Sequence, residues 1–150
     1  MKVLFQLLVC GALYGWSCLS AAQTTSPAND LILIRASAKT PAEVVEAIKS
    51  YSEAKKWAYM GANSVKPKQG EVTMVKVCIP QIGTIMWPLG LHLSALLPCG
   101  NIGVYLNQGK TEVSMLHPRY MQILNPHPEV ERAVGVATPL LLEMLDAVTK

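Results

Sequence analysis

The chain has 150 residues, of which 51% are hydrophobic, and its formal net charge is +3. This length suits one domain with a single core. The weak positive charge does not favour a nucleic-acid-binding protein, and the basic residues of the first half alternate with glutamates, which indicates a solvated surface of mixed charge.

The N-terminus has the layout of a secretory signal peptide. Lys2 precedes a short apolar run, and the small residues of Ser20-Ala21-Ala22 follow it. We therefore expect a signal peptide at 1–22, cleavage before Gln23, a flexible leader at 23–30 and a single domain at 31–150. Cleavage leaves Cys78 and Cys99 as the cysteines of a periplasmic or secreted protein.

Two other interpretations of the N-terminus are weaker. A transmembrane anchor needs roughly 20 apolar residues, and glycines and a serine interrupt this shorter run. A lipoprotein acylated at Cys18 fits poorly, because Trp16 lies where lipoprotein processing requires small or aliphatic residues. We expect no membrane span after signal cleavage.

The first half of the domain predicts three strands and one helix. Residues 31–37 are aliphatic and indicate a strand. Thr40 and Glu43 form a capping-box pattern around Pro41, and apolar residues at helical spacing continue to about Lys56. Residues 57–61 indicate the start of a second strand, 66–70 a turn, and the alternation at 71–78 a third, half-buried strand.

Residues 100–150, after the second cysteine, predict a hairpin and a long helix. Two β-rich runs at 101–106 and 111–116 flank a short loop that contains Gly109. Residues 117–121 and 125–128 are expected to be irregular. A helix should begin near Pro128, and Pro139 should kink it or restart it with Thr138 as a new cap.

The region between Lys76 and Lys110 contains no charged residue. A connection this apolar must bury itself, bind something or face a partner. A short helical turn is expected near Met86. The remaining large apolar residues either fill the core or form an apolar pocket or interface: Trp87, Leu89, Leu91 and Leu93.

The order of elements favours an α+β fold, because consecutive strands usually pair antiparallel. We expect an antiparallel sheet that two helices cover on one face. The segment from Cys78 to Cys99 should join two strands and lie across an end or edge of that sheet.

Three short motifs resemble the bacterial domain-of-unknown-function 302 family: Cys78-Ile-Pro80, Leu97-Pro98-Cys99 and the Gly109-Lys110 turn. The resemblance covers the chain from about Leu31 onward. It implies a small α+β domain resembling a single copy of the TATA-binding-protein-like fold, often dimeric, and no established reaction. Ile79 and Gly100 replace the asparagine and arginine common in that family.

The two cysteines have three interpretations. In an oxidising compartment they most simply form a disulfide. They could also be unbonded thiols without a special role. Alternatively they form a redox or soft-metal site, for which thiolate, thioether and imidazole ligands suit copper. The candidate metal ligands are Cys78, Cys99, His92 and Met86.

No pattern of a hydrolase or nucleotide enzyme is present, and the chain is more simply explained as a non-enzyme. The leading hypothesis is an exported binding or accessory protein, with copper or another soft ligand near Cys78 and Cys99. The first alternative is a thiol–disulfide or other small redox enzyme that uses the same cysteines. The second is a structural homodimer with no small ligand.

Export predicts a defined mass for the purified protein. When the full gene is expressed in a bacterial host, we expect intact mass spectrometry to show a chain that begins at Gln23. A variant in which Ala22 is replaced by a bulky residue, Ala22→Trp, should retain residues 1–22, because processing requires small residues at this position. Full-length mass for the unaltered chain would contradict cleavage.

Overall fold

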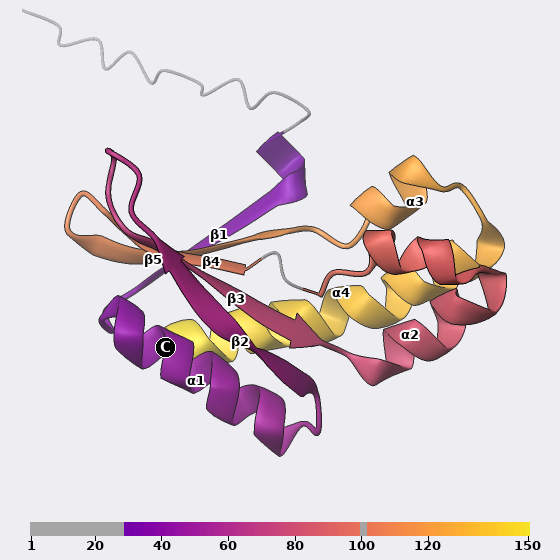
Figure 1. Ribbon diagram of the computed structural model, residues 1–150, viewed down its shortest axis with the longest axis horizontal. Helices are drawn as coiled ribbons and strands as arrows, with labels where there is room; N and C mark the ends of the chain where they lie inside the picture. The colour runs from indigo at the N-terminus through magenta and orange to yellow at the C-terminus, as the bar shows by residue number, and fades with distance from the viewer. Residues whose placement is uncertain (1–28, 100–101) are drawn as a thin grey trace, which may run out of the picture.

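The structure, a computed structural model, describes residues 29–99 and 102–150. The expected signal peptide at 1–22, most of the leader at 23–30, and Gly100 lie outside the described residues. Five strands form one antiparallel sheet in the order β1-β5-β4-β3-β2 (Figure 1). Their bounds are Ile32–Ser37, Ala58–Val65, Val72–Cys78, Ile102–Asn107 and Lys110–Leu116 for β1 to β5.

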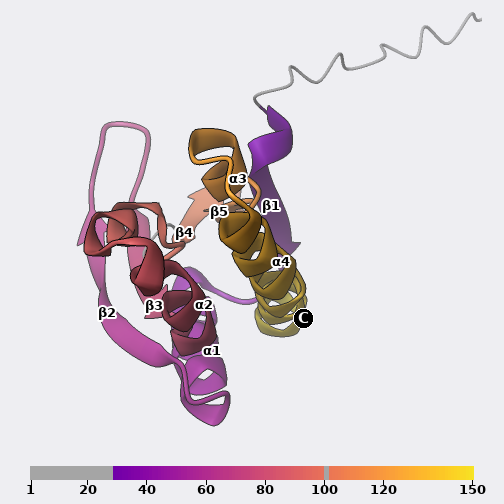
Figure 2. The same cartoon turned by 90° about the vertical axis from the view of Figure 1, so that its right-hand side faces the viewer.

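Two long helices cover one face of this sheet (Figures 1 and 2). Helix α1 (Pro41–Ala54) contacts β2, β3 and β4, and α4 (Pro128–Thr149) contacts β1 and α1. Lys55, just after α1, pairs with Glu143 of α4 at 2.9 Å. The α+β class, the antiparallel sheet and its one-sided cover are therefore confirmed. The likeness to the TATA-binding-protein fold stays a prediction.

The strand register separates the two faces of the sheet. Val75, Val104 and Val113, on three adjacent strands, point toward the helices and are fully or almost fully buried. The residues that alternate with them point away from the helices, including Ile34 on β1 and Met74 on β3, which remain exposed. The core thus lies between the sheet and the helices, as period-2 alternation requires.

The uncharged connector joins β3 to β4, which are adjacent strands, as the sequence predicts. It forms α2 (Pro80–Met86) and two 3₁₀ helices, η2 (Trp87–Leu89) and η3 (Leu91–Leu96). Helix α2 packs against α4, so the connector extends the helical layer beyond the sheet (Figure 1). Its apolar composition follows from this burial, because Ile82 and Met86 belong to the core.

Two local expectations differ from the structure. Residues 117–127 contain a short helix, α3 (Tyr120–Leu124), because Tyr120 and Met121 are buried against the core. Helix α4 continues through Pro139, so the expected restart is wrong, while the alternative of a kink at Pro139 stays a prediction. The Thr138 hydroxyl donates to the Val134 carbonyl at 2.8 Å, within the helix, and therefore does not act as a new N-cap.

The described part of the chain has no helix that combines the length and the apolarity needed to span a membrane.

The capping box at the start of α1 is confirmed. The Thr40 hydroxyl accepts from the Glu43 backbone N–H at 3.3 Å, and the Glu43 carboxylate accepts from the Thr40 backbone N–H at 2.7 Å. Hydrogen bonds from the Thr40 backbone and side chain lower the pKa of the Glu43 carboxyl. The ionised carboxylate therefore stabilises this end of the helix.

This pKa direction predicts a pH-dependent effect of Glu43→Gln. Because the folded-state pKa is lowered, the charge stabilises the protein above the unfolded-state pKa, and this contribution disappears as pH falls through the folded-state pKa. Urea unfolding should show the wild type as the more stable protein at pH 7, with the difference shrinking as the pH falls through the folded-state pKa.

The matched control is Glu53→Gln, which removes an exposed carboxylate at the opposite end of α1. This variant should be neutral or slightly stabilising at pH 7, because negative charge is unfavourable near a helix C-terminus. Equal destabilisation by both substitutions would contradict a specific role for the capping box.

Candidate functional site

Cys78 and Cys99 form a disulfide, with their Cα atoms 4.6 Å apart. Cys78 ends β3, and Cys99 closes the connector a few residues before β4 begins. Because β3 and β4 are paired, the bond closes the connector where it leaves and re-enters the sheet. The expectation that these cysteines are neighbours at adjacent strand ends is confirmed.

The other candidate metal ligands differ in exposure. Met86 is fully buried among core residues. His92 is exposed on η3, and its ring lies against Gly90, where an added Cβ would be 2.5 Å from the ring carbon Cε1. Within residues 29–99 and 102–150, no group of three His, Cys, Asp or Glu side chains is arranged to hold a metal.

Bonded sulfurs are not thiolates, so the sulfur ligands of the copper hypothesis require prior reduction. The copper site and the alternative of a redox enzyme both stay predictions from the sequence.

The four large apolar residues of the connector divide between core and surface. Leu93 is buried and Leu89 is partly buried against the core. Leu91 is 77% exposed and Trp87 is 44% exposed. The indole ring of Trp87 nevertheless packs closely on Gly83. A Cβ added to Gly83 would lie 2.9 Å from that ring. Core filling and surface exposure therefore both occur within this segment.

Three hollows of the described residues lie at the other end of β3, near Val72 and Leu106. One of them, which we call the α1 groove, has a volume of about 680 Å³. It lies between the start of α1, the turn joining β2 to β3, and β4. Its lining consists of Thr40, Pro41, Ala42, Val45, Glu46, Ser64, Gln69, Gly70, Glu71, Thr73, Val104 and Leu106.

The α1 groove has an apolar floor and a polar rim. Val45, Val104 and Leu106 supply the apolar surface. On the rim, the hydroxyls of Ser64 and Thr73 are hydrogen-bonded to each other at 2.8 Å. This combination is typical of small-molecule sites, in which a few polar groups orient a mainly apolar ligand.

Two carboxylates, those of Glu46 and Glu71, are the only formal charges among the groove's lining residues. Each pairs with a lysine that does not line the groove: Lys49 lies 3.6 Å from Glu46, and Lys66 lies 3.2 Å from Glu71. Because the pairs are exposed, water screens them and they hold the carboxylates weakly. The charges that line the groove itself are thus both negative, and their partner lysines lie outside the lining.

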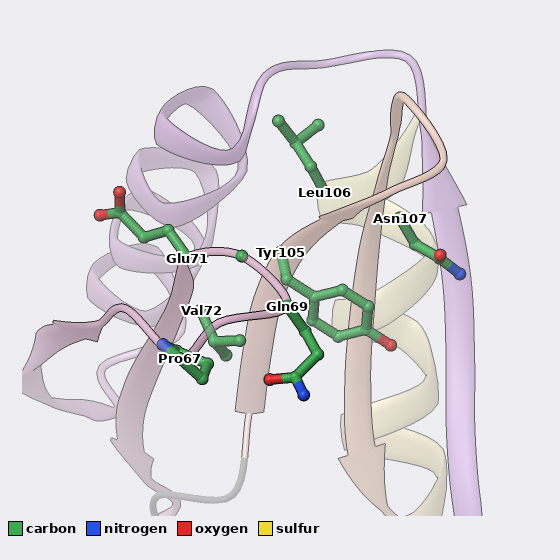
Figure 3. Close-up of a pocket in the computed structure, with 8 residues that line it drawn as sticks. Pro67, Gln69, Glu71, Val72, Tyr105, Leu106 and Asn107 are labelled. Carbon is green, nitrogen blue, oxygen red and sulfur yellow. The ribbon is translucent and has the colours of Figure 1, made fainter.

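A second hollow of about 310 Å³ lies on the other side of the β2–β3 turn. Figure 3 shows Gln69 and Tyr105 close together there, while Glu71 and Leu106 point toward the start of α1. Burial raises the pKa of the Tyr105 phenol, an effect that hydrogen bonding to Ser114 opposes and the Glu112 carboxylate reinforces. This phenol is therefore neutral and can act as a hydrogen-bond donor.

A third hollow, also of about 310 Å³, adjoins the α1 groove at Thr40 and Leu106 and is lined by Lys39 and Lys110. The Lys39 ammonium donates to the Val148 carbonyl at 3.1 Å, which ties it to the end of α4. The carboxylates of Glu46 and Glu71 therefore line the α1 groove, whereas Lys39 and Lys110 line this third hollow.

The α1 groove could not be read from the sequence. Val45 has the helical spacing of a core residue, yet it lies at the margin of the buried stripe and remains half-buried. Glu71 looks like an ordinary turn-flanking charge. Only the antiparallel pairing of β3 with β4 brings this turn beside Leu106.

The fold and the disulfide together define a small α+β domain closed by one covalent cross-link. The chain matches the family described as Domain of unknown function DUF302 over residues 34–148, and it belongs to that family. Its fold is similar to that in the crystal structure of an uncharacterized conserved DUF302 protein from Bacillus stearothermophilus. The TM-score is 0.69 at 18% identity, over 80% of this chain and 98% of that chain. No curated protein matches this chain.

Removal of the disulfide should destabilise the fold. We expect the double substitution Cys78→Ser and Cys99→Ser to lower the free energy of unfolding by about 3 kcal/mol, because the open chain gains conformational entropy when unfolded. Urea titration followed by circular dichroism measures the loss. Reductant should lower the stability of the wild type by a similar amount and leave the double variant unchanged. Equal stability of all four samples would contradict a cross-link in the folded protein.

Proposed function

We propose that this protein is an exported binding domain that holds a small amphipathic amine in the α1 groove. Two features support export: the apolar run after Lys2, and a disulfide, which persists in oxidising compartments. The binding role rests on the groove, which lies at the end of the sheet remote from the cysteines.

The observation that carries this proposal is a groove of about 680 Å³ with an apolar floor. Ligand pockets typically occupy roughly 300–1,000 Å³ and combine apolar walls with a few polar groups. Val104 is almost fully buried in the sheet beneath the groove, while Leu106 at the end of the same strand is exposed. An apolar ligand body placed over these residues would remove exposed hydrocarbon from water.

The charge of the lining supports the amine. Glu46 comes from α1 and Glu71 from the β2–β3 turn, so the carboxylates reach the groove from two different elements. A ligand ammonium between them would add a cation to two exposed ion pairs. Each such contact contributes roughly 0.2–1 kcal/mol, and the apolar floor supplies the rest of the affinity.

Octylamine is a direct probe of this proposal. Calorimetric titration of the full chain should show saturable binding of one octylamine, weaker binding of octanol and the weakest binding of octanoate. Replacing both carboxylates, in Glu46→Gln with Glu71→Gln, should weaken octylamine binding by about fivefold. The same change should leave octanol binding unchanged.

A second pair of variants tests the location. Ala42→Trp places an indole in the groove and should abolish binding. Ala54→Trp adds the same group to an exposed position at the end of α1 outside the groove and should have no effect. Octanoate bound as tightly as octylamine would contradict the ligand class, and unaltered binding by Ala42→Trp would contradict the site.

A further inference from the structure

Strand β2 leaves one of its two sides unpaired, and we call this side of Ala58–Val65 the β2 edge. Strand β2 is the outermost strand of the sheet and pairs with β3 alone (Figure 1). No charged residue lies between Lys56 and Lys66, and Met60 is 62% exposed. Soluble proteins usually protect such an edge with charge or proline, because its free N–H and C=O groups can pair with another chain.

The opposite edge of the sheet, which β1 forms, is protected by charge. Arg35 lies within β1, and its guanidinium donates to the Ile34 carbonyl and to the Asp146 carboxylate, each at 3.2 Å. Strand β2 carries no arginine or lysine that could do the same. The two edges of the sheet therefore differ in how readily they accept a further strand.

The regular half of β2 lies beside the α1 groove. A bulge between Tyr59 and Gly61 interrupts the register, and the pairing with β3 is regular from Ala62 to Val65. Within this half, Ser64 lines the α1 groove. Successive residues of a strand point to opposite faces of the sheet. A residue placed opposite Ser64 on an added strand would therefore direct its side chain to the groove side of the sheet.

We propose that the β2 edge and the α1 groove together bind an extended peptide, with a lysine side chain of that peptide in the groove. This inference rests on the proposed function and deepens it, because a lysine side chain is an amine on an apolar stem. An added strand pairs through its backbone, while pockets beside it select its alternate side chains. Alternate residues from Ala62 to Val65 direct their N–H and C=O groups outward, so about four main-chain hydrogen bonds are available.

The carboxylates of the groove select lysine among the possible side chains. An added strand would lie two strand spacings from β3, about 10 Å. Glu71 immediately precedes β3, and its side chain points toward the start of α1 (Figure 3). A lysine and a glutamate side chain together span that separation, with the lysine stem on apolar surface and its ammonium at the rim. Exposed ion pairs are weak, so Lys66 and Lys49 can give way to the ammonium of the ligand.

A peptide from another protein fits this site better than a segment of the same chain. Residues 23–30 contain no lysine or arginine, and they precede β1, which forms the opposite edge of the sheet. The β2 strand of a second copy would bring no lysine to the groove, because the strand contains none. The neighbours of the peptide lysine would lie on the face of Asn63 and Val65. Val65 is 45% exposed, so β-branched apolar residues are expected beside the lysine.

A capped pentapeptide, Thr-Val-Lys-Val-Thr, tests the ligand class. Calorimetric titration of the full chain should show saturable binding of one peptide, which excess octylamine displaces because both ligands occupy the groove. Norleucine in place of the peptide lysine should weaken binding by about fivefold, and glutamate should weaken it further. Glu46→Gln with Glu71→Gln should lower the affinity for the lysine peptide to that for the norleucine peptide, and should leave the latter unchanged.

Methylation of the peptide backbone tests the pairing with β2. Successive residues of an extended peptide direct their N–H groups to opposite sides, so only one alternate set faces β2. Two versions of the lysine peptide carry the same number of N-methyl groups, at residues two and four or at residues three and five. Their affinities should differ by at least tenfold, because only one version loses hydrogen bonds to β2.

The results separate this inference from the proposed function. Octylamine binding without peptide binding overturns the inference and leaves the proposed function intact, whereas failure of both ligands overturns the two together. Equal effects of the two methylation patterns overturn the pairing with β2. A glutamate peptide bound as tightly as the lysine peptide overturns the ligand class, and peptide binding that survives Ala42→Trp overturns the site. A chain that sediments as a dimer and binds no peptide points to a second copy at the β2 edge and also overturns the inference.

Discussion

One-sided burial of the five-stranded sheet is the constraint on which the other features depend. Val75, Val104 and Val113 are removed from water by two helices, and the burial of such apolar surface is the main driving force for folding. The same strands present their alternate residues to the opposite side, where neither long helix lies. An antiparallel sheet tolerates this arrangement because one of its faces can meet water.

The two ends of the sheet differ in what covers them. At the end of β3 marked by Cys78, the connector folds into α2, η2 and η3, and a disulfide joins it to the approach to β4. Tyr120 of α3 adds a hydrogen bond of 2.7 Å to the Leu96 carbonyl of η3. At the other end of β3, the helical layer begins at Pro41 and does not extend over Leu106. The end of the sheet next to Cys78 is therefore apolar and cross-linked, whereas the end next to Leu106 contains the α1 groove.

This division explains the composition of the uncharged segment. The segment between Lys76 and Lys110 is apolar largely because it contributes Ile82, Met86 and Leu93 to the core. Its two cysteines, Cys78 and Cys99, are bonded to each other. By contrast, the α1 groove is built from residues of ordinary composition, such as Ala42, Ser64 and Glu71. Their significance arises from their position at the margin of the core.

The sequence by itself determined the local elements: the capping box of Thr40 and Glu43, the strand periods, the hairpin around Gly109 and the antiparallel pairing of consecutive strands. These follow from interactions between residues close along the chain. The sequence allowed Cys78 and Cys99 to be neighbours, and the structure places their Cα atoms 4.6 Å apart. The sequence did not reveal α3 or the continuity of α4 through Pro139, because the burial of Tyr120, and of Ala137 and Leu141 on either side of Pro139, overrides local propensity. Only the tertiary structure decided where the core stops. The groove is a boundary of packing between distant elements, and no local pattern encodes such a boundary.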